Sequence, residues 1–370
     1  MLWVKDRLAS ANGNSIYYNT VNPLLPKTYK DMSFTYEGTR LTGITINYDN
    51  ETTIYYDYYY YNHQGLRVKK VETYEYTDDR DSDETTTLYF YDGNKLITKY
   101  RSETDRIDFL YDVNGMLYGF INNKTDKYYY VRDVLQNILC IVDNAGNLIV
   151  KYDYNVYGEL ENITGSNTQL ALRNPFRWKG YYHDSETDWF YCQSRYYVPE
   201  WCRWLTPDKV DYLESDNING VNLYCYCRNN LVMYVDPSGH IAISLGVLML
   251  IGAVVGAIVG AGTSAVMQAA SNNLDWSKVD IRLVIVDGVF GAIDGALSVT
   301  GIGGVLGMVA GGSLSGMQYI VSQAVTGEKF NINEFLLSSS LGAIFSFHLV
   351  VMMDQTQLVF GRQQVTTWID

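Results

Sequence analysis

The fold is decided by residues 138–152, which read ILCIVDNAGNLIVKY. Apolar residues lead up to Asp143, a short Asn/Ala/Gly turn follows, and a second apolar run begins at Leu148. Asn, Asp and Gly tolerate positive φ and therefore suit reversals between antiparallel strands. The segment predicts two strands joined by a turn at Gly146.

The same pattern occurs several times upstream of this segment. Aromatic-rich residues lead into Asn/Asp/Gly turns at Asn62-His63-Gln64-Gly65, Tyr91-Asp92-Gly93-Asn94, Tyr111-Asp112-Val113-Asn114-Gly115 and, more weakly, Leu135-Gln136-Asn137. Gly93, Gly115 and Asn137 are spaced by 22 residues, which indicates a repeat. We therefore expect residues 50–240 to be mainly antiparallel β, with reversals at Gly65, Gly93, Gly115 and Gly146. An ordinary β-meander is the alternative, but the Tyr-rich run at residues 55–61 favours a large curved sheet.

Composition divides the chain near His240. Of the 34 Tyr, all but Tyr319 precede residue 241, and the last of the six Pro is Pro237. Residues 241–370 contain 18 of the 31 Gly. Tyr-rich, turn-rich sequence suits strands, whereas apolar Gly-rich sequence suits closely packed helices. We predict four regions: an incomplete N-terminal strand region (1–50), repeats (51–173), a domain that contains the motifs described next (174–240) and a helical tail (241–370).

Residues 174–240 contain a distinctive series of motifs in fixed order. They read FRWKGYYHDSET (176–187), WFYCQSRYYVPE (189–200), RWLTPD (203–208), NLYCYCRNN (222–230) and YVDPSGH (234–240). This series resembles the RHS repeat-associated core domain, which ends the YD-repeat shell of bacterial polymorphic toxins. Teneurins have a related shell, and the upstream turns extend a weaker resemblance to about residue 50.

The resemblance implies a β-rich antiparallel YD-repeat sheet followed by an α-helical Gly-rich hydrophobic domain. Family shells wrap into a hollow cocoon that encloses a C-terminal toxin. About 240 residues precede the boundary here, so we expect an open or partial shell, or a truncated copy of a longer protein. The chain departs from the family at four positions, where Asp188 and Cys202 replace Gly, Val198 replaces Asp, and Leu231 replaces Pro.

Two aspartates lie in Pro-flanked turns of the core motif, Asp208 and Asp236. In family members that cleave themselves, core aspartates perform the reaction, and two carboxylates sharing a proton can act as acid and base on a water. The resemblance thus implies, at most, aspartyl-type autoproteolysis soon after His240. Alternatively, each aspartate caps its turn. Arg195 and Arg203 are expected to pair with these acids or to stack on Tyr and Trp rings.

Other chemistry has little support in the sequence. The net charge of −13 disfavours a nucleic-acid partner. The five Cys and four His lack zinc-site spacing, so we expect no metal, and no cofactor motif is visible. The N-terminus shows no signal-peptide pattern, which predicts another export route or a fragment.

The tail begins with a long uncharged stretch, because Asp275 is its first charge. Residues 241–267 and 295–325 are candidate transmembrane segments. Three glycines at four-residue spacing, Gly252, Gly256 and Gly260, would form one helix face. Its expected partner is the stripe Gly303, Gly307 and Gly311, and Gly291 and Gly295 repeat the spacing. A soluble helical plug inside a toxin cage is the alternative.

Two functions follow from these observations. The first is the C-terminal part of a polymorphic toxin, a shell end that presents a membrane-active helical effector or translocation segment. Its partners would be a membrane and an immunity protein. The second is a structural cell-surface or cell-wall protein whose repeats bind glycans or neighbouring cells, with the tail as anchor. Both place the protein outside the cell or on its surface, associated with a membrane through the tail.

Overall fold

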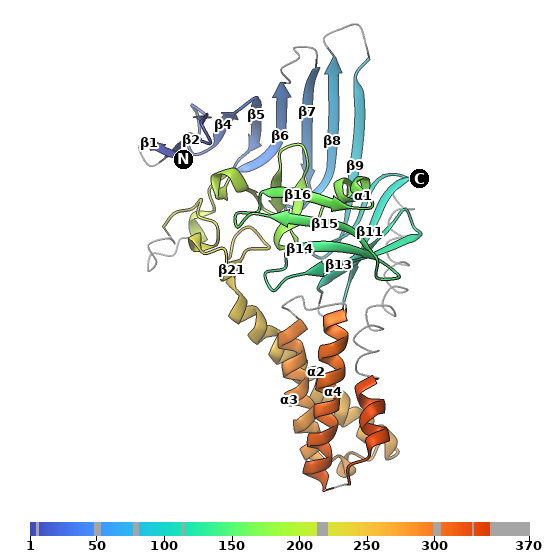
Figure 1. Ribbon diagram of the computed structural model, residues 1–370. Helices are drawn as coiled ribbons and strands as arrows, with labels where there is room; N and C mark the ends of the chain where they lie inside the picture. Colours follow the sequence, from blue (N-terminus) through green and yellow to red (C-terminus); the bar gives the residue numbers. More distant parts are fainter. Residues whose placement is uncertain are drawn as a thin grey trace. The chain divides into compact units, whose positions relative to one another are not determined.

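The computed structural model describes residues 1–4, 7–47, 53–76, 81–112, 115–212, 221–298, 305–327 and 329–340 (Figure 1). The chain forms two compact units. The first consists of Met1–Phe109, Phe120–Lys127 and Ile149–Ile243, and the second of Leu110–Gly119, Tyr128–Leu148 and the chain from Ser244 onward. The two units are described separately below.

Long antiparallel strands form most of the first unit, and residues 128–132 and 138–143 of the second unit are also strands. The sheet order follows the chain, beginning at β1 and ending at β16, so the sheet is open. The strands are β1 (Leu2–Val4), β2 (Arg7–Ala11), β3 (Asn14–Tyr18), β4 (Pro26–Tyr29), β5 (Met32–Glu37), β6 (Arg40–Asn47), β7 (Thr53–Tyr61), β8 (Arg67–Tyr76), β9 (Asp83–Asp92), β10 (Lys95–Ser102), β11 (Asp105–Tyr111), β12 (Leu117–Asn122), β13 (Asp126–Arg132), β14 (Ile138–Asp143), β15 (Leu148–Tyr154) and β16 (Leu160–Gly165). The predicted antiparallel β structure is confirmed, including the strands across residues 128–154.

Five of the described turns share one geometry. An Asn or Asp begins each turn, and its side-chain oxygen accepts the N–H of the residue four positions later, at 2.7–3.0 Å. The residue three positions later has positive φ and donates its N–H to the first carbonyl. The first and fourth residues are Asn62 and Gly65, Asp112 and Gly115, Asp133 and Gln136, Asp143 and Gly146, and Asn155 and Gly158. The predicted reversals at Gly65, Gly115 and Gly146 are thus confirmed, and Gly93 (φ 58°) reverses the chain between β9 and β10.

The motif region folds into a compact domain of short elements. Its four-stranded antiparallel sheet has the order β17 (Tyr182–Asp184), β18 (Trp189–Cys192), β19 (Arg195–Val198) and β20 (Arg203–Trp204). Around it lie α1 (Thr168–Arg173), the 3-10 turns η1 (Trp178–Gly180), η2 (Pro199–Trp201), η3 (Val210–Tyr212) and η4 (Cys227–Asn229), and the two-residue strands β21 (Tyr234–Val235) and β22 (Ile243–Ser244). Its buried centre is aromatic and consists of Trp178, Tyr181, Phe190, Cys192, Tyr197, Trp204, Tyr226 and Cys227.

Rings of this domain pack on the long sheet. Tyr29 of β4 meets Trp201 edge-on at 5.0 Å between ring centroids. Phe34 of β5 lies 5.4 Å from Trp189, and Tyr89 of β9 meets the ring of Tyr182 at 5.7 Å. Buried aromatic pairs of this kind stabilise a fold beyond the area that they bury. These ring contacts therefore hold the core domain against the long sheet.

Two of the four departures from the family pattern fall on left-handed backbone. Asp188 has φ 58° and Cys202 has φ 52°. Glycine adopts this region freely, whereas a residue with a Cβ is strained there. The glycines that the resemblance implies at these positions would have suited this backbone, and this chain adopts the left-handed conformation without them.

The second unit contains the helical tail: α2 (Leu245–Ser271), η5 (Trp276–Lys278), α3 (Ile281–Ser298) and α4 (Val305–Thr326), followed by helical residues at 332–340. A Cβ added at Gly256 would clash with the backbone of Gly291, and one added at Gly295 would clash with the carbonyl oxygen of Gly252. A Cβ at Gly260 would strike the backbone of Asp287. The two helices therefore meet backbone to backbone along their glycines.

The partner of the α2 stripe is thus the Gly291–Gly295 stripe of α3, rather than the expected Gly303, Gly307 and Gly311. Gly303 lies outside the described residues, and the structure gives no side-chain surroundings for Gly307 and Gly311. The Gly291–Gly295 stripe and the expected stripe have the same four-residue spacing. Because α3 is the next α-helix after α2 in the chain, its stripe is the one that packs on the glycines of α2.

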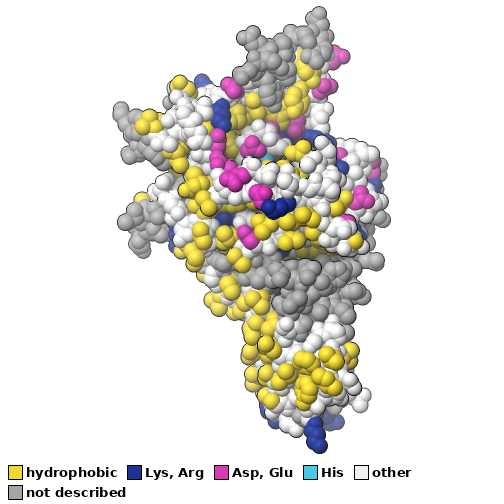
Figure 2. All heavy atoms as spheres, viewed as in Figure 1, with side chains coloured by type: hydrophobic (Ala, Val, Ile, Leu, Met, Phe, Trp, Pro, Cys, Tyr) yellow, Lys and Arg dark blue, Asp and Glu magenta, His cyan; other side chains and the backbone are white. Residues whose placement is uncertain are grey.

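Within the described part of the chain, α2 is the helix long and apolar enough to cross a membrane, over Gly246–Ser271 with a mean hydropathy of 2.1. The second candidate, residues 295–325, covers the end of α3 and most of α4, with residues 299–304 outside the described residues. Figure 2 shows hydrophobic side chains gathered over the helical part, with Lys and Arg at one end of it.

Candidate functional site

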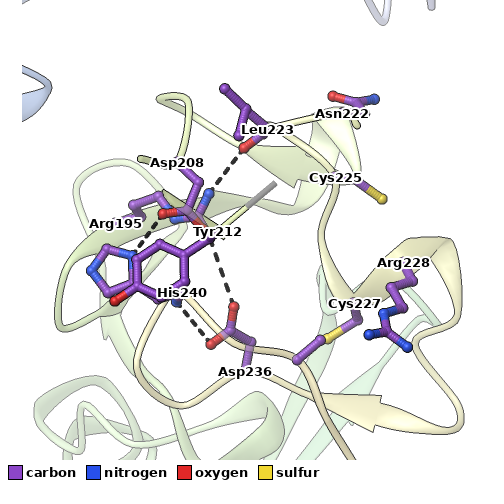
Figure 3. A pocket seen from close by; sticks show the side chains of 11 residues that line it. Arg195, Asp208, Tyr212, Asn222, Leu223, Cys225, Cys227, Arg228, Asp236 and His240 are labelled. Carbon is purple, nitrogen blue, oxygen red and sulfur yellow. Dashed lines mark hydrogen bonds and ion pairs between the residues drawn. The ribbon is translucent and has the colours of Figure 1, made fainter. Parts of the chain in front are cut away.

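The two predicted aspartates meet in the core domain, where Asp208 follows β20 and Asp236 follows β21 (Figure 3). Arg195, the first residue of β19, lies between them. Its Nη2 is 2.6 Å from Oδ2 of Asp208 and 3.8 Å from Oδ2 of Asp236. One guanidinium therefore faces both carboxylates, and the site is a pair of acids that share a cation.

Asp208 is held at both oxygens. Oδ2 pairs with Arg195, while Oδ1 lies 2.7 Å from Nδ1 of His240 and accepts the N–H of Lys209 at 2.8 Å. Only 7% of its side chain is exposed. Both oxygens of Asp208 therefore have a partner, and one of these partners is the guanidinium of Arg195.

Asp236 is almost fully buried and holds the chain that follows it. Its Oδ1 accepts the hydroxyl of Ser238 at 3.2 Å and the N–H groups of His240 at 3.1 Å and Ile241 at 3.2 Å. Its own N–H donates to the hydroxyl of Tyr181 at 2.8 Å. Burial raises the pKa of Asp236, although Arg195 and these hydrogen bonds oppose the shift. Asp236 therefore caps the Pro237–Gly239 turn, as the structural alternative requires, and also faces Asp208 across Arg195.

The core packing fixes Arg195 in place. Its guanidinium carbon lies 4.3 Å from the ring centroid of Trp204, and its Nη1 donates to the carbonyl of Leu223 at 3.0 Å. Its Nε donates to the carbonyl of Gly239. Arg203 instead stacks on Tyr224, at 4.2 Å. The expectation for these two arginines is met, with Arg195 pairing and stacking and Arg203 stacking.

The arrangement suits acid–base chemistry on a peptide bond. Two buried carboxyl groups whose surroundings differ can act as an acid and a base, as in carboxyl dyads, and burial raises the pKa of Asp236. In the described part of the chain, no three His, Cys, Asp or Glu residues gather to hold a metal ion. The cation between the two acids is the guanidinium of Arg195.

One residue of the site, His240, was not predicted. Its side chain bonds Asp208, and its ring stacks on Tyr212 of η3 at 4.8 Å with 15° between the planes. His240 is the last residue of the YVDPSGH segment, and this position at the end of the motif is the one signal in the sequence that could have found it.

No family model matches the chain. The tRNA3(Ser)-specific nuclease WapA of Bacillus spizizenii is 28% identical over 252 residues, which cover 64% of this chain and 10% of that protein. Salivary gland surface protein 1 of Aedes aegypti is 29% identical over 251 residues, 64% of this chain and 7% of that protein. Toxin subunit YenC1 of Yersinia entomophaga is 32% identical over 98 residues, 26% of this chain and 9% of that protein. The chain thus spans a tenth or less of the length of these relatives.

Among solved structures, the Photorhabdus luminescens Tc holotoxin pore aligns with 62% of this chain and 12% of its own, at 18% identity and a TM-score of 0.45.

Proposed function

We propose that this chain, an RHS/YD-repeat protein, is the shell end of a polymorphic toxin that presents a membrane-active helical segment. The relatives that are toxin subunits and nucleases support a polymorphic-toxin family. The single observation that favours a membrane is α2, whose 26-residue segment Gly246–Ser271 has a mean hydropathy of 2.1 and is almost entirely unburied. A nuclease activity is not part of the proposal, because the net charge of −13 disfavours RNA.

The helical hairpin suits a bilayer in both length and surface. The 27 residues of α2 extend about 40 Å, more than the roughly 30 Å of a bilayer core. Its outward side chains are large and apolar, and Leu250 is 63% and Ile258 69% exposed. The glycine seam leaves these side chains pointing away from α3. Lipid is the solvent that such a surface prefers, since water contact costs about 25 cal/mol per Å² of apolar area.

Self-cleavage at the carboxylate pair would release this segment. Asp208 takes a proton from a water, whose oxygen forms a bond to the carbonyl carbon of His240. The C–N bond to Ile241 breaks, and the proton of Asp236 goes to the leaving nitrogen. The products are a carboxyl group on His240 and an amine on Ile241. The contact that favours this assignment is the hydrogen bond between Asp236 and the N–H of Ile241.

A cell-surface function is the second candidate. The mosquito relative is named as a surface protein, and the outer face of β7 exposes Tyr58 and Tyr60 at 46% and 50%. Exposed tyrosines suit contacts with glycans or with neighbouring cells. In this case the tail anchors the protein, and no release step is needed.

Intact mass spectrometry of the purified full chain tests the release step. The proposal expects two fragments separated near His240–Ile241, and a single intact mass for Asp208→Asn and for Asp236→Asn. An intact parent chain, or variants that cleave at the parental rate, would exclude self-cleavage. Flotation of the full chain with phosphatidylcholine vesicles tests the membrane step separately. Binding is expected for the parent, and its absence would favour a tail that is a soluble plug.

A further inference from the structure

His240 is held by three contacts, and two of them depend on its being a histidine. Its main-chain N–H donates to Asp236, and any non-proline residue would do the same. Its imidazole makes the other two contacts, to Asp208 and to the ring of Tyr212. The side chain is 23% exposed, so it lies at the edge of the hollow that the two acids line.

The bond to Asp208 defines the proton position on the imidazole. The carboxylate accepts hydrogen bonds, so Nδ1 of His240 is the donor. Arg195 occupies the other oxygen of Asp208. His240 and Arg195 therefore hold the carboxylate from opposite oxygens and fix its plane.

The flat stacking on Tyr212 adds a second restraint. With the planes 15° apart at 4.8 Å, the imidazole cannot rotate about its Cβ–Cγ bond without losing contact with both partners. Residue 240 is thus restrained at its side chain by Asp208 and at its main chain by Asp236. Asp208 and Asp236 therefore both bind His240.

We propose that His240 is a positioning residue: its imidazole, bonded to Asp208 and stacked on Tyr212, seats the His240–Ile241 peptide between the two carboxylates. A role of this positioning in catalysis rests on the proposed self-cleavage. The position of the His240–Ile241 peptide is a property of the uncleaved chain, and it can be measured without any self-cleavage.

Digestion of the full chain by added proteinase K measures the seating. The rate of appearance of fragments that end at residues 239–243 is followed by mass spectrometry. His240→Ala is expected to raise this rate about tenfold, because loss of a hydrogen bond to a charged group typically costs this factor or more. His240→Asn, which keeps a donor near the position of Nδ1, should restore most of the protection. His63→Ala, which changes an exposed histidine in a turn of the repeat sheet, is the matched control and should leave the rate unchanged.

An unchanged junction rate in His240→Ala would overturn the proposal, and so would equal rates for His240→Asn and His240→Ala. The rate is taken with added proteinase K after subtraction of the rate without it, so failure of the self-cleavage proposal is separate. If the parent does cleave and Asp236→Asn does not, His240→Ala should cleave at least tenfold more slowly, or at a shifted bond. Parental rate and position in that variant would also reject the positioning role.

Discussion

Arg67 and Asp184 lie 117 positions apart in the chain and form a buried, two-fold ion pair. Nη1 of Arg67 lies 2.6 Å from Oδ2 of Asp184, and Nη2 lies 2.9 Å from Oδ1. The rings of Tyr59, Tyr89, Tyr182 and Tyr191 surround the guanidinium at 4.6–5.1 Å. Arg67 begins β8 of the repeat sheet and Asp184 ends β17 of the core domain. The pair therefore joins the repeats to the core.

Asp184→Leu should destabilise the full chain by about 3–5 kcal/mol, because it leaves the Arg67 charge buried without a partner. The double variant Arg67→Met/Asp184→Leu should lose less than the sum of the two single changes. Urea unfolding followed by tryptophan fluorescence measures these values. Lys151→Gln, which breaks the exposed pair with Asp153, is the control and should have a much smaller effect. Additive losses in the double variant would show that the two side chains are not coupled.

Stability should fall at alkaline pH because of Asp57. Burial, and then the carboxylate of Glu186, raise the pKa of Asp57 to about 9, although Lys70 opposes the shift. The folded state thus keeps a proton that the unfolded chain releases near pH 4. The resulting stability is complete below pH 4 and is lost as the pH rises through about 9.

The urea midpoint of the parent should therefore decrease from pH 6 to pH 9, and Asp57→Asn should show a flatter profile. The hydroxyls of Tyr55 and Tyr59 donate to different oxygens of Asp57, at 2.7 and 3.0 Å. Asparagine keeps one of these two acceptors and cannot ionise. Burial also lowers the pKa of Lys99 to about 8, but this titration is common to both proteins and cancels in the comparison. Identical slopes for the parent and Asp57→Asn would refute the assignment.

Cys202→Gly should stabilise the protein by about 1 kcal/mol, because φ is 52° at this position and glycine removes the left-handed strain. Cys202→Ala removes the same sulfur but keeps a Cβ, so it should give no gain. Thermal unfolding of the three proteins checks the prediction. A gain for alanine equal to that for glycine would assign the effect to the thiol and not to the backbone.

The sequence could predict the features that depend on neighbouring residues. Asn or Asp followed by Gly predicts a turn wherever the side chain can accept a nearby N–H, as at Asn62 and Asp143. Asn155–Gly158 follows the same rule, 22 residues after the turn Asp133–Gln136, and was not among the predicted turns. Gln136 shows that the turn also forms without glycine.

Features that depend on distant residues could not be predicted in this way. Nothing in the local pattern of Arg67 identifies Asp184, since a buried ion pair leaves no periodicity. The order of the motifs identified Asp208 and Asp236 as candidate site residues. The hydrogen bond from His240 to Asp208 could not be predicted, because it depends on the path of the intervening chain. Glycine spacing predicted a close helix contact but could not choose between two stripes with equal spacing.

Gly256→Leu should separate α2 from α3, because its side chain would strike the backbone of Gly291. Gly262→Leu is a matched control on the same helix, since a Cβ there meets nothing within 4 Å. Amide hydrogen exchange of the full chain in detergent should be at least tenfold faster in α3 for the first variant and unchanged for the second. Equal exchange in both variants would mean that the glycine seam is not needed for the hairpin.

Dye release from phosphatidylcholine vesicles by the purified full chain tests the central claim, a membrane-active tail, most directly. The parent should release dye, and Leu250→Lys/Ile258→Lys should not, because it places two charges on the exposed face of α2 at a cost of about 3 kcal/mol each in a bilayer. Val21→Lys, at a 91% exposed position between β3 and β4, should release dye like the parent. Vesicles that stay sealed with the parent, or leak equally with the double lysine variant, would contradict the account.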